Sequence, residues 1–230
     1  MLKKVTKVNF IYNGEHKIED TYLKEIKLNW NKNNKNYYDG DIYCVDEIID
    51  NNIPQVIISK TKFSSLLYAK QTKKIVIRSL FSGSYIKTKD NYICIIINNR
   101  GVLNLIGGMA SNEDFTNNTF DYKKCLYREI KEELGINLDD NPNFINTLKY
   151  LKVPSPEELK LHYYSLGTIF EINTILTKEE LELLFKNNIH DKEIKSLEFF
   201  NKENYKDLYN YKRKAKYIEE LFNLIFKKGE

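Results

Sequence analysis

The stretch from Asp121 to Gly135 constrains this chain most strongly, because it reads as one complete helix with both ends specified. Asp121 is a good N-cap residue, helix formers without proline follow it, and Gly135 stands where a left-handed C-cap is expected. Apolar residues recur every four positions, at Leu126, Ile130 and Leu134. The stretch therefore predicts an amphipathic helix with one buried face.

Three carboxylates of this helix share a second face. Glu129, Glu132 and Glu133 are spaced i, i+3 and i+4, which places them within one turn. Like charges at this spacing repel by about a few tenths of a kcal/mol per pair, and a hard divalent cation would remove that penalty. Mg²⁺ prefers oxygen ligands and keeps positions open for water and phosphate. A lone acidic turn is more often a solvated surface, so the neighbouring residues decide the interpretation.

The residues from Arg128 to Ile136 read REIKEELGI. They resemble, at every position, the second half of the Nudix box, whose pattern is Arg, Glu, aliphatic, any, Glu, Glu, any, Gly, aliphatic. A glycine pair, Gly107 and Gly108, precedes them after a short apolar run, as in that family. Glycines there let the backbone approach phosphate or metal closely, because no Cβ intervenes.

The first half of the box fits less directly. It requires a glycine, five residues, a glutamate and seven further residues before the arginine. Glu113 follows Gly107 by the required six positions. Asp114 has the same spacing from Gly108. Arg128 then comes about six or seven residues late, so we expect an insertion in the intervening segment, which is rich in Asn and Thr.

The resemblance implies the α/β class, as a Nudix-type α/β/α sandwich with a mixed β-sheet. It also implies a Mg²⁺-dependent hydrolase, with Mn²⁺ as the alternative ion, that cleaves the diphosphate linkage of a nucleoside diphosphate joined to another moiety. By the same resemblance Glu132 and Glu133 are the principal metal ligands, and Glu129 is a further ligand or the base that activates water. Gly108 would supply the backbone turn over the metal, and Glu133 counts among the catalytic residues.

Four positions are expected to be structural. In the family the box arginine, here Arg128, pairs with an acidic residue of the preceding loop. We assign this partner to Glu113, with Asp114 or neither residue as alternatives. Gly107 would begin the glycine turn, and Gly135 would close the helix.

A loop after the box is expected to complete the site. In the family, a loop glutamate just ahead of a strand often completes the metal site or serves as the base, and Glu193 matches this position best. His190 and Asp191 in the same loop are rivals. Glu157 and Glu158 in an earlier loop could also reach the metal, although two glutamates after a proline are an ordinary helix start as well.

The chain is expected to have two parts. Residues 1–80 would form a small N-terminal α+β section of uncertain role, with Thr61 capping a short helix, and residues 81–230 would form the Nudix hydrolase domain. Further elements are expected at 18–30 and 212–227 (helices), and at 42–49, 55–59, 84–88, 92–98, 102–106, 144–151 and 162–172 (strands).

Composition excludes several classes of protein. The longest uninterrupted apolar run, Ile93–Ile97, is far shorter than the roughly 20 residues of a membrane-spanning helix, and no apolar region follows the basic start, so we expect neither a membrane span nor a secretory signal. The three cysteines, Cys44, Cys94 and Cys125, are odd in number, widely spaced and without metal spacing. This pattern is typical of a reducing cytoplasm.

The expected partner is a small nucleoside diphosphate derivative, such as a nucleotide sugar or dinucleotide. A net charge of +4 permits an anionic substrate but gives no clustered basic stripe, which counts against a dedicated nucleic-acid binder. Two alternatives stay open: a messenger-RNA decapping enzyme acting on capped RNA, and a nucleotide-binding Nudix module without catalysis. Homodimer formation also stays open.

Overall fold

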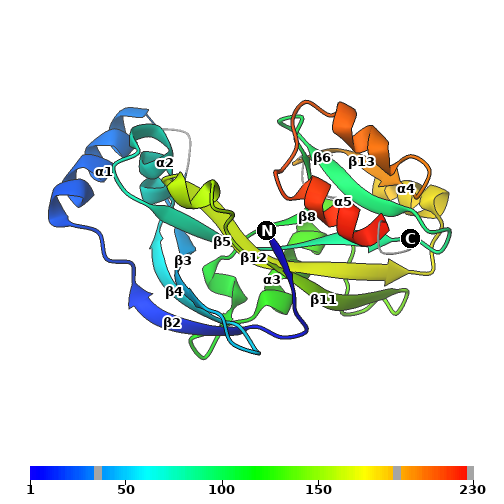
Figure 1. The fold of residues 1–230 in the computed structure, drawn as a ribbon, viewed down its shortest axis with the longest axis horizontal. Helices are drawn as coiled ribbons and strands as arrows, with labels where there is room; N and C mark the ends of the chain where they lie inside the picture. The colour runs from blue at the N-terminus through cyan, green and yellow to red at the C-terminus, as the bar shows by residue number, and fades with distance from the viewer. Residues whose placement is uncertain (34–37, 189–192, 227–230) are drawn as a thin grey trace.

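The computed structural model describes residues 1–33, 38–188 and 193–226, and its largest element is an eleven-stranded mixed β-sheet (Figure 1). The strand order is β1-β11-β12-β5-β3-β4-β2, and β6 and β8 pair with β5 outside this path, while β7 and β13 pair with β6. Its strands are β1 (Leu2–Lys4), β2 (Asn9–Glu15), β3 (Asp41–Ile49), β4 (Gln55–Lys62), β5 (Ile77–Lys87), β6 (Ile93–Asn98), β7 (Leu103–Asn104), β8 (Ile106–Met109), β11 (Phe144–Lys152), β12 (Tyr163–Thr174) and β13 (Ile194–Phe200).

Five α-helices and a small hairpin complete the described part of the chain. The helices are α1 (Asp20–Asn33), α2 (Phe63–Thr72), α3 (Tyr122–Leu134), α4 (Lys178–Asn187) and α5 (Ile218–Phe226). Short 3₁₀ helices occur at Asn112–Asp114, Glu158–Lys160 and Tyr205–Asn210, and the hairpin consists of β9 (Phe115–Thr116) and β10 (Thr119–Phe120). No described helix has the length and apolar character needed to cross a bilayer.

Helices α3 and α5 cover opposite faces of the sheet centre, where β5 and β12 run parallel (Figure 1). Successive side chains of a strand point to opposite faces. Accordingly, Leu80 packs in the core cluster that contains the apolar residues of α3, whereas its neighbour Phe81 packs in the cluster that contains those of α5. The predicted fold class, α/β with a mixed sheet between helical layers, is confirmed.

The N-terminal section extends the same sheet. Strands β3 and β4 form the expected antiparallel hairpin, β2 pairs with β4 in parallel, and α1 and α2 lie beside these strands (Figure 1). Strand β5 starts at Ile77, so a single strand runs across the predicted boundary at residue 80. Thr61 does not cap α2, because it still belongs to β4 and Lys62 is the N-cap residue. The division into two parts remains a prediction.

One predicted strand is split where the chain changes partners. Residues 102–106 were expected to form a single strand, but β7 pairs with β6 and β8 pairs with β5. Leu105 lies between the two short strands and is buried. The change of partner places the glycine pair of β8 against β5 rather than in an isolated turn.

Candidate active site

Helix α3 carries the candidate site, and its ends are formed as the sequence predicts. One carboxylate oxygen of Asp121 accepts hydrogen bonds from the backbone amides of Lys123 and Lys124 at 3.0 and 2.9 Å. Gly135 is the C-cap residue, with a left-handed φ of 67°. The apolar face of the helix is fully buried, which fixes the direction of its acidic face.

Two of the three box carboxylates are buried against the glycine pair of β8. Glu133 accepts a hydrogen bond from the backbone amide of Gly107 at 2.7 Å. A Cβ atom on Gly108 would collide with the carboxylate of Glu129. Glu129 and Glu133 are buried, whereas the side chain of Glu132 is 46% exposed. The site is therefore a protein-lined acidic turn with one carboxylate open to solvent.

Arg128 is held by Asp114, which is completely buried. Its Nε and Nη2 atoms donate to the two carboxylate oxygens of Asp114 at 3.1 and 2.9 Å, the bidentate geometry that suits a guanidinium. Nη1 donates to Glu129 at 2.7 Å and to Glu132 at 3.0 Å. Glu113, our predicted partner, is exposed, so that assignment is wrong and its alternative, Asp114, makes the pair.

The hairpin β9–β10 occupies the segment in which the sequence predicts an insertion. Asn117 and Asn118 form its tip, with φ of 49° and 58°, values that suit a two-residue hairpin turn. The backbone amide of Asp121 donates to the carbonyl of Asp114 at 2.8 Å, so the loop closes on itself. Without the six residues of Phe115–Phe120, Arg128 would follow Asp114 by eight positions, which is the spacing of the box pattern. The register through Gly108 and Asp114 is thus the one that the geometry favours.

The buried carboxylates resist ionisation. Burial raises the pKa of Glu133 to about 8, with the charges of Glu129 and Glu193 adding to the shift and the Gly107 amide opposing it. Burial likewise raises the pKa of Glu129 to about 7, against the lowering effect of Arg128. Burial alone would lower the pKa of Arg128, but its hydrogen bonds to Asp114 and the nearby carboxylates outweigh this and raise it. A bound divalent cation would favour the charged form of both glutamates.

The carboxylate oxygens of Glu129, Glu132 and Glu133 do not form a cluster compact enough to surround one metal ion. Among the described residues, only His16, Cys44 and Asp46 offer three metal-binding atoms within 4.8 Å of one another. Arg128 holds Glu129 and Glu132, while Glu133 is turned to Gly107. The donor set still suits Mg²⁺, because it consists of carboxylates from one helical turn beside a backbone position that admits no Cβ.

Glu193 lies near the box carboxylates at the start of β13. Its side chain is exposed, its charge contributes to the raised pKa of Glu133, and its carbonyl accepts from the backbone amide of Asn99 at 2.7 Å. The rivals His190 and Asp191 fall outside the described residues.

The two loop glutamates considered from sequence do not join the site. Glu158 instead forms a buried ion pair with Lys152 at 2.7 Å and accepts from the backbone amide of Ser155 at 3.0 Å. Glu157 is exposed in the same loop.

Two cations, Lys70 and Arg100, come near each other in the fold. Lys70 on α2 has its Nζ atom 5.2 Å from the ring centre of Tyr163. Desolvation lowers the pKa of Lys70, and repulsion by Arg100, in the turn between β6 and β7, lowers it further. No ion pair of either side chain occurs within the described ranges. Arg100 directly follows Asn99, whose backbone amide donates to the carbonyl of Glu193.

Comparisons with known proteins give structural similarity alone. No protein-family model matches the sequence, and no curated protein matches it. The chain is similar to a Nudix hydrolase from Nitrosomonas europaea, with 13% identity and a TM-score of 0.43 over 64% of this chain and 86% of that chain. It is also similar to the Nudix domain of NrtR from Shewanella oneidensis in complex with ADP ribose, with 9% identity and a TM-score of 0.42 over 73% and 99% of the two chains. A third similar structure, a Nudix-family hydrolase from Clostridium perfringens, has 17% identity and a TM-score of 0.38 over 66% and 99%. At these values we base the function on the site itself.

Proposed function

We propose that this chain is a Mg²⁺-dependent hydrolase of the Nudix type, which cleaves the diphosphate linkage of a nucleoside diphosphate joined to another moiety. The observation that carries the proposal is the burial of Glu129 and Glu133 against the turn formed by Gly107 and Gly108. Burying acidic side chains together is costly unless a cation compensates them. A hard divalent cation that also contacts substrate phosphate accounts for both the residue types and their placement.

Each residue of the turn has a distinct part in this proposal. Glu129, Glu132 and Glu133 would hold Mg²⁺, which would polarise the phosphoryl oxygens and neutralise charge on the leaving phosphate. Arg128 contacts Glu129 and Glu132 in the described structure, so it would orient these ligands rather than touch substrate. Glu193, or else Glu129, would accept the proton from the attacking water.

Two neighbouring cations support the proposed substrate class. Lys70 and Arg100 would provide positive charge for a phosphate that is not being attacked, which a diphosphate-linked substrate has and a phosphate monoester lacks. The ADP ribose bound by the Nudix domain of NrtR is a molecule of this class.

A screen with one variant tests the proposal. Nucleoside diphosphate derivatives and capped RNA are incubated with Mg²⁺ or Mn²⁺, and the products are identified by mass. We expect Mg²⁺-stimulated cleavage of the small derivatives and a loss of at least about 100-fold in turnover for Glu133→Gln, the range for a positioned catalytic carboxylate. The amide can still accept from Gly107, so the variant should fold.

The control is Glu179→Gln, which alters an exposed glutamate of α4 and should leave turnover unchanged. Cleavage of capped RNA alone would redirect the proposal to decapping. Absence of any metal-stimulated cleavage, or full activity of Glu133→Gln, would refute it.

A further inference from the structure

A second group of metal-binding side chains lies in the N-terminal section, on three adjacent strands. Cys44 and Asp46 are two residues apart on β3, at a register irregularity, and both side chains contact Ser59. His16 immediately follows β2, and its backbone amide donates to the carbonyl of Lys60 on β4 at 2.7 Å. Ser59 of β4 lies between them. The order β3-β4-β2 therefore brings His16 across β4 toward Asp46.

The four side chains are in direct contact. His16 Nδ1 lies 2.8 Å from Asp46 Oδ1 and 3.1 Å from Ser59 Oγ. Ser59 Oγ donates to Asp46 Oδ1 at 2.9 Å and lies 3.3 Å from Cys44 Sγ. The candidate ligand atoms of His16, Cys44 and Asp46 lie within 4.8 Å of one another. Tetrahedral Zn²⁺ with bonds of about 2.0 to 2.3 Å separates its ligand atoms by roughly 3.3 to 3.8 Å, so small side-chain rotations suffice.

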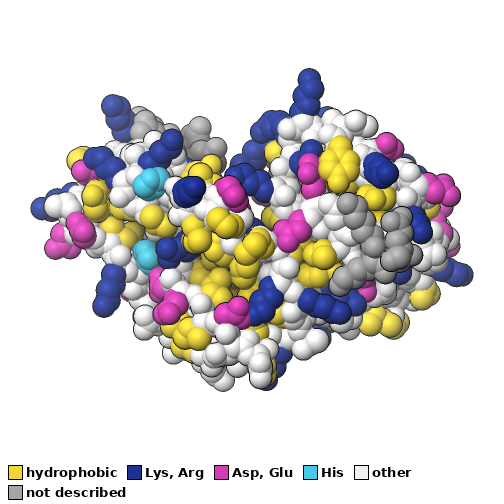
Figure 2. Space-filling view, viewed as in Figure 1, with side chains coloured by type: hydrophobic (Ala, Val, Ile, Leu, Met, Phe, Trp, Pro, Cys, Tyr) yellow, Lys and Arg dark blue, Asp and Glu magenta, His cyan; other side chains and the backbone are white. Residues whose placement is uncertain are grey.

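Charge and access also suit a zinc ion. A thiolate and a carboxylate balance the two positive charges of Zn²⁺, so the loaded group would be neutral, which matters because Cys44 is fully buried. The side chains of His16 and Asp46 keep 19% and 26% of their surface exposed, which gives the ion a route from solvent. Figure 2 shows histidine side chains at the surface of the face in view.

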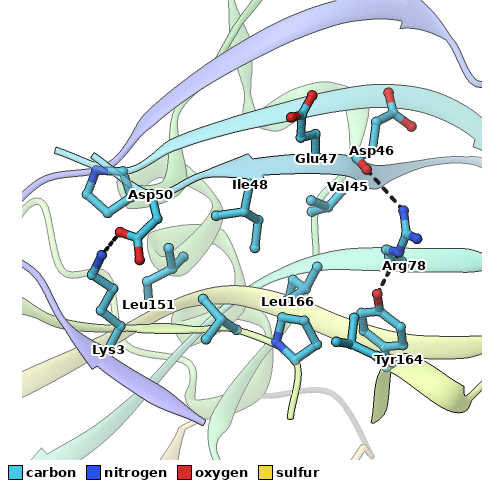
Figure 3. Close-up of a pocket in the computed structure, with 14 residues that line it drawn as sticks. Lys3, Val45, Asp46, Glu47, Ile48, Asp50, Arg78, Leu151, Tyr164 and Leu166 are labelled. Atoms are coloured by element: carbon cyan, nitrogen blue, oxygen red, sulfur yellow. Dashed lines mark hydrogen bonds and ion pairs between the residues drawn. The ribbon is translucent and has the colours of Figure 1, made fainter. Parts of the chain in front are cut away.

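Arg78 bonds to the backbone of Asp46 and not to its carboxylate. Its Nη1 atom donates to the backbone oxygen of Asp46 at 3.0 Å, and its Nε atom donates to the hydroxyl of Tyr164 at 2.6 Å. Both Asp46 and Arg78 line a cavity of about 330 Å³, and Figure 3 shows the Asp46 carboxylate directed away from Arg78. The carboxylate oxygens are therefore left to His16, Ser59 and an ion.

We propose that His16 Nδ1, Cys44 Sγ and an oxygen of Asp46 bind one Zn²⁺, with water as the fourth ligand, and that this ion joins β2 to β3 across β4. Zn²⁺ displaces the thiol proton of Cys44, which passes to the buffer, and the step needs no oxidant or reductant. Sulfur and nitrogen ligands select Zn²⁺ over Mg²⁺, so this site is chemically distinct from the acidic turn of α3. Ser59 would orient Asp46 and His16.

Cobalt substitution tests the site directly, because a bond between Co²⁺ and a thiolate gives an absorption band in the near ultraviolet that carboxylates do not. The full chain is titrated with Co²⁺ in excess Mg²⁺, which keeps the acidic turn occupied, and Zn²⁺ is then added in competition. We expect a thiolate band that saturates at one Co²⁺ per chain and disappears as Zn²⁺ displaces it.

Two variants and a matched control decide which residues bind. Cys44→Ser should abolish the band, and Cys94→Ser, which alters another fully buried cysteine, should retain it. His16→Gln changes a partly exposed residue that is expected to be tolerated, and it should weaken Zn²⁺ binding by more than about tenfold, since even indirect partners of metal sites contribute that much.

The possible results of these titrations distinguish a zinc site from its absence. If Cys44→Ser does not fold by circular dichroism, the His16→Gln titration carries the test alone. A band that persists in Cys44→Ser, a wild-type chain without a thiolate band, or unchanged Zn²⁺ affinity in His16→Gln would each overturn the proposal.

Discussion

At the scale of single residues, the pair of Arg128 and Asp114 organises the acidic turn. The guanidinium reaches three carboxylates at once, and only Asp114 is fully buried and bidentate. The neighbouring Glu113 has the same charge but faces solvent. Of these two adjacent acidic residues, only Asp114 supports Arg128. Comparing substitutions at the two positions therefore isolates the contribution of the buried pair to the free energy of unfolding.

We expect Asp114→Ala to lower the free energy of unfolding by about 3 to 5 kcal/mol, because it leaves the mostly buried guanidinium of Arg128 without its main partner. Glu113→Ala should change it by less than about 0.5 kcal/mol, as surface substitutions usually do. Urea denaturation of both variants measures the difference. Equal effects would show that Glu113 also supports the arginine.

The raised pKa values predict how the metal-free protein responds to pH. The pKa of Glu133 is about 8 in the folded protein against a model value of 4.5, so between these values the folded state binds more protons than the unfolded state. The contribution of Glu133 to the free energy of unfolding is therefore greatest below pH 4.5. It is lost as pH rises toward 8, at up to about 1.4 kcal/mol per pH unit.

Urea denaturation in chelator across this interval measures the effect, and Glu133→Gln is the reference because it cannot ionise. We expect the stability of the wild type relative to Glu133→Gln to fall as pH rises, and Mg²⁺ to reduce that fall. A difference between the two proteins that stays constant with pH would contradict the assigned burial of Glu133.

At the scale of elements, the hairpin β9–β10 lengthens the segment between Asp114 and Arg128, which remain in direct contact. Its two aromatic residues pack on the N-terminal strands: the ring of Phe115 stacks on Tyr43 at 3.8 Å, and Phe120 meets Phe10 edge to face at 4.9 Å. The hairpin is thus anchored at its base by Asp114 and Asp121 and along one side by the core.

Substitutions at the tip of this hairpin test its backbone conformation and leave the acidic turn unchanged. Asn118 has φ of 58°, a left-handed value that a β-branched residue adopts only at a cost of about 1 to 2 kcal/mol. We expect Asn118→Val to lower thermal stability accordingly and Asn118→Gly to leave it equal or higher. Thr119→Val, at the exposed neighbouring strand position, is the matched control and should have little effect.

Local patterns predicted much of this architecture. The caps and apolar spacing of α3 are set by interactions within the helix, and a capping box of Thr177 and Glu180 begins α4. The insertion was expected but its form was not, although asparagine, which occupies both tip positions, is one of the few residues besides glycine that tolerate a left-handed φ.

The other features of the site depend on contacts between residues far apart in the chain, which local sequence patterns do not predict. Only the fold decides whether Glu113 or Asp114 is buried beneath Arg128. Lys70 lies outside the box, and its proximity to Arg100 arises from packing between distant segments.

At the scale of the whole molecule, two neighbouring cations come from segments far apart in the chain. Figure 2 shows the surface notched between the part that carries α1 and α2 and the part that carries β6 and β13. Lys70 belongs to the first of these and Arg100 to the second. A substrate held by both cations would contact both parts at once, and the N-terminal section would then take part in binding.

Pyrophosphate is a suitable probe for this arrangement. We expect Lys70→Met and Arg100→Met each to weaken its binding by about tenfold, which corresponds to the loss of one charge-assisted hydrogen bond of about 1.5 kcal/mol. Calorimetric titration in the presence of Mg²⁺ measures the affinities. Lys27→Met, at an exposed position of α1, should bind as the wild type does. Wild-type affinity in both of the first two variants would remove the cations from the binding site.

Because the backbone leaves Asp114 and returns to it at Asp121, the distance in sequence between the glycines and the arginine is independent of their distance in space. A loop that closes on itself can lengthen or shorten over evolution while the catalytic groups keep their positions. A sequence search that requires a constant spacing between the glycines and the arginine would miss such chains. The motif before the loop and the motif after it should therefore be searched for separately.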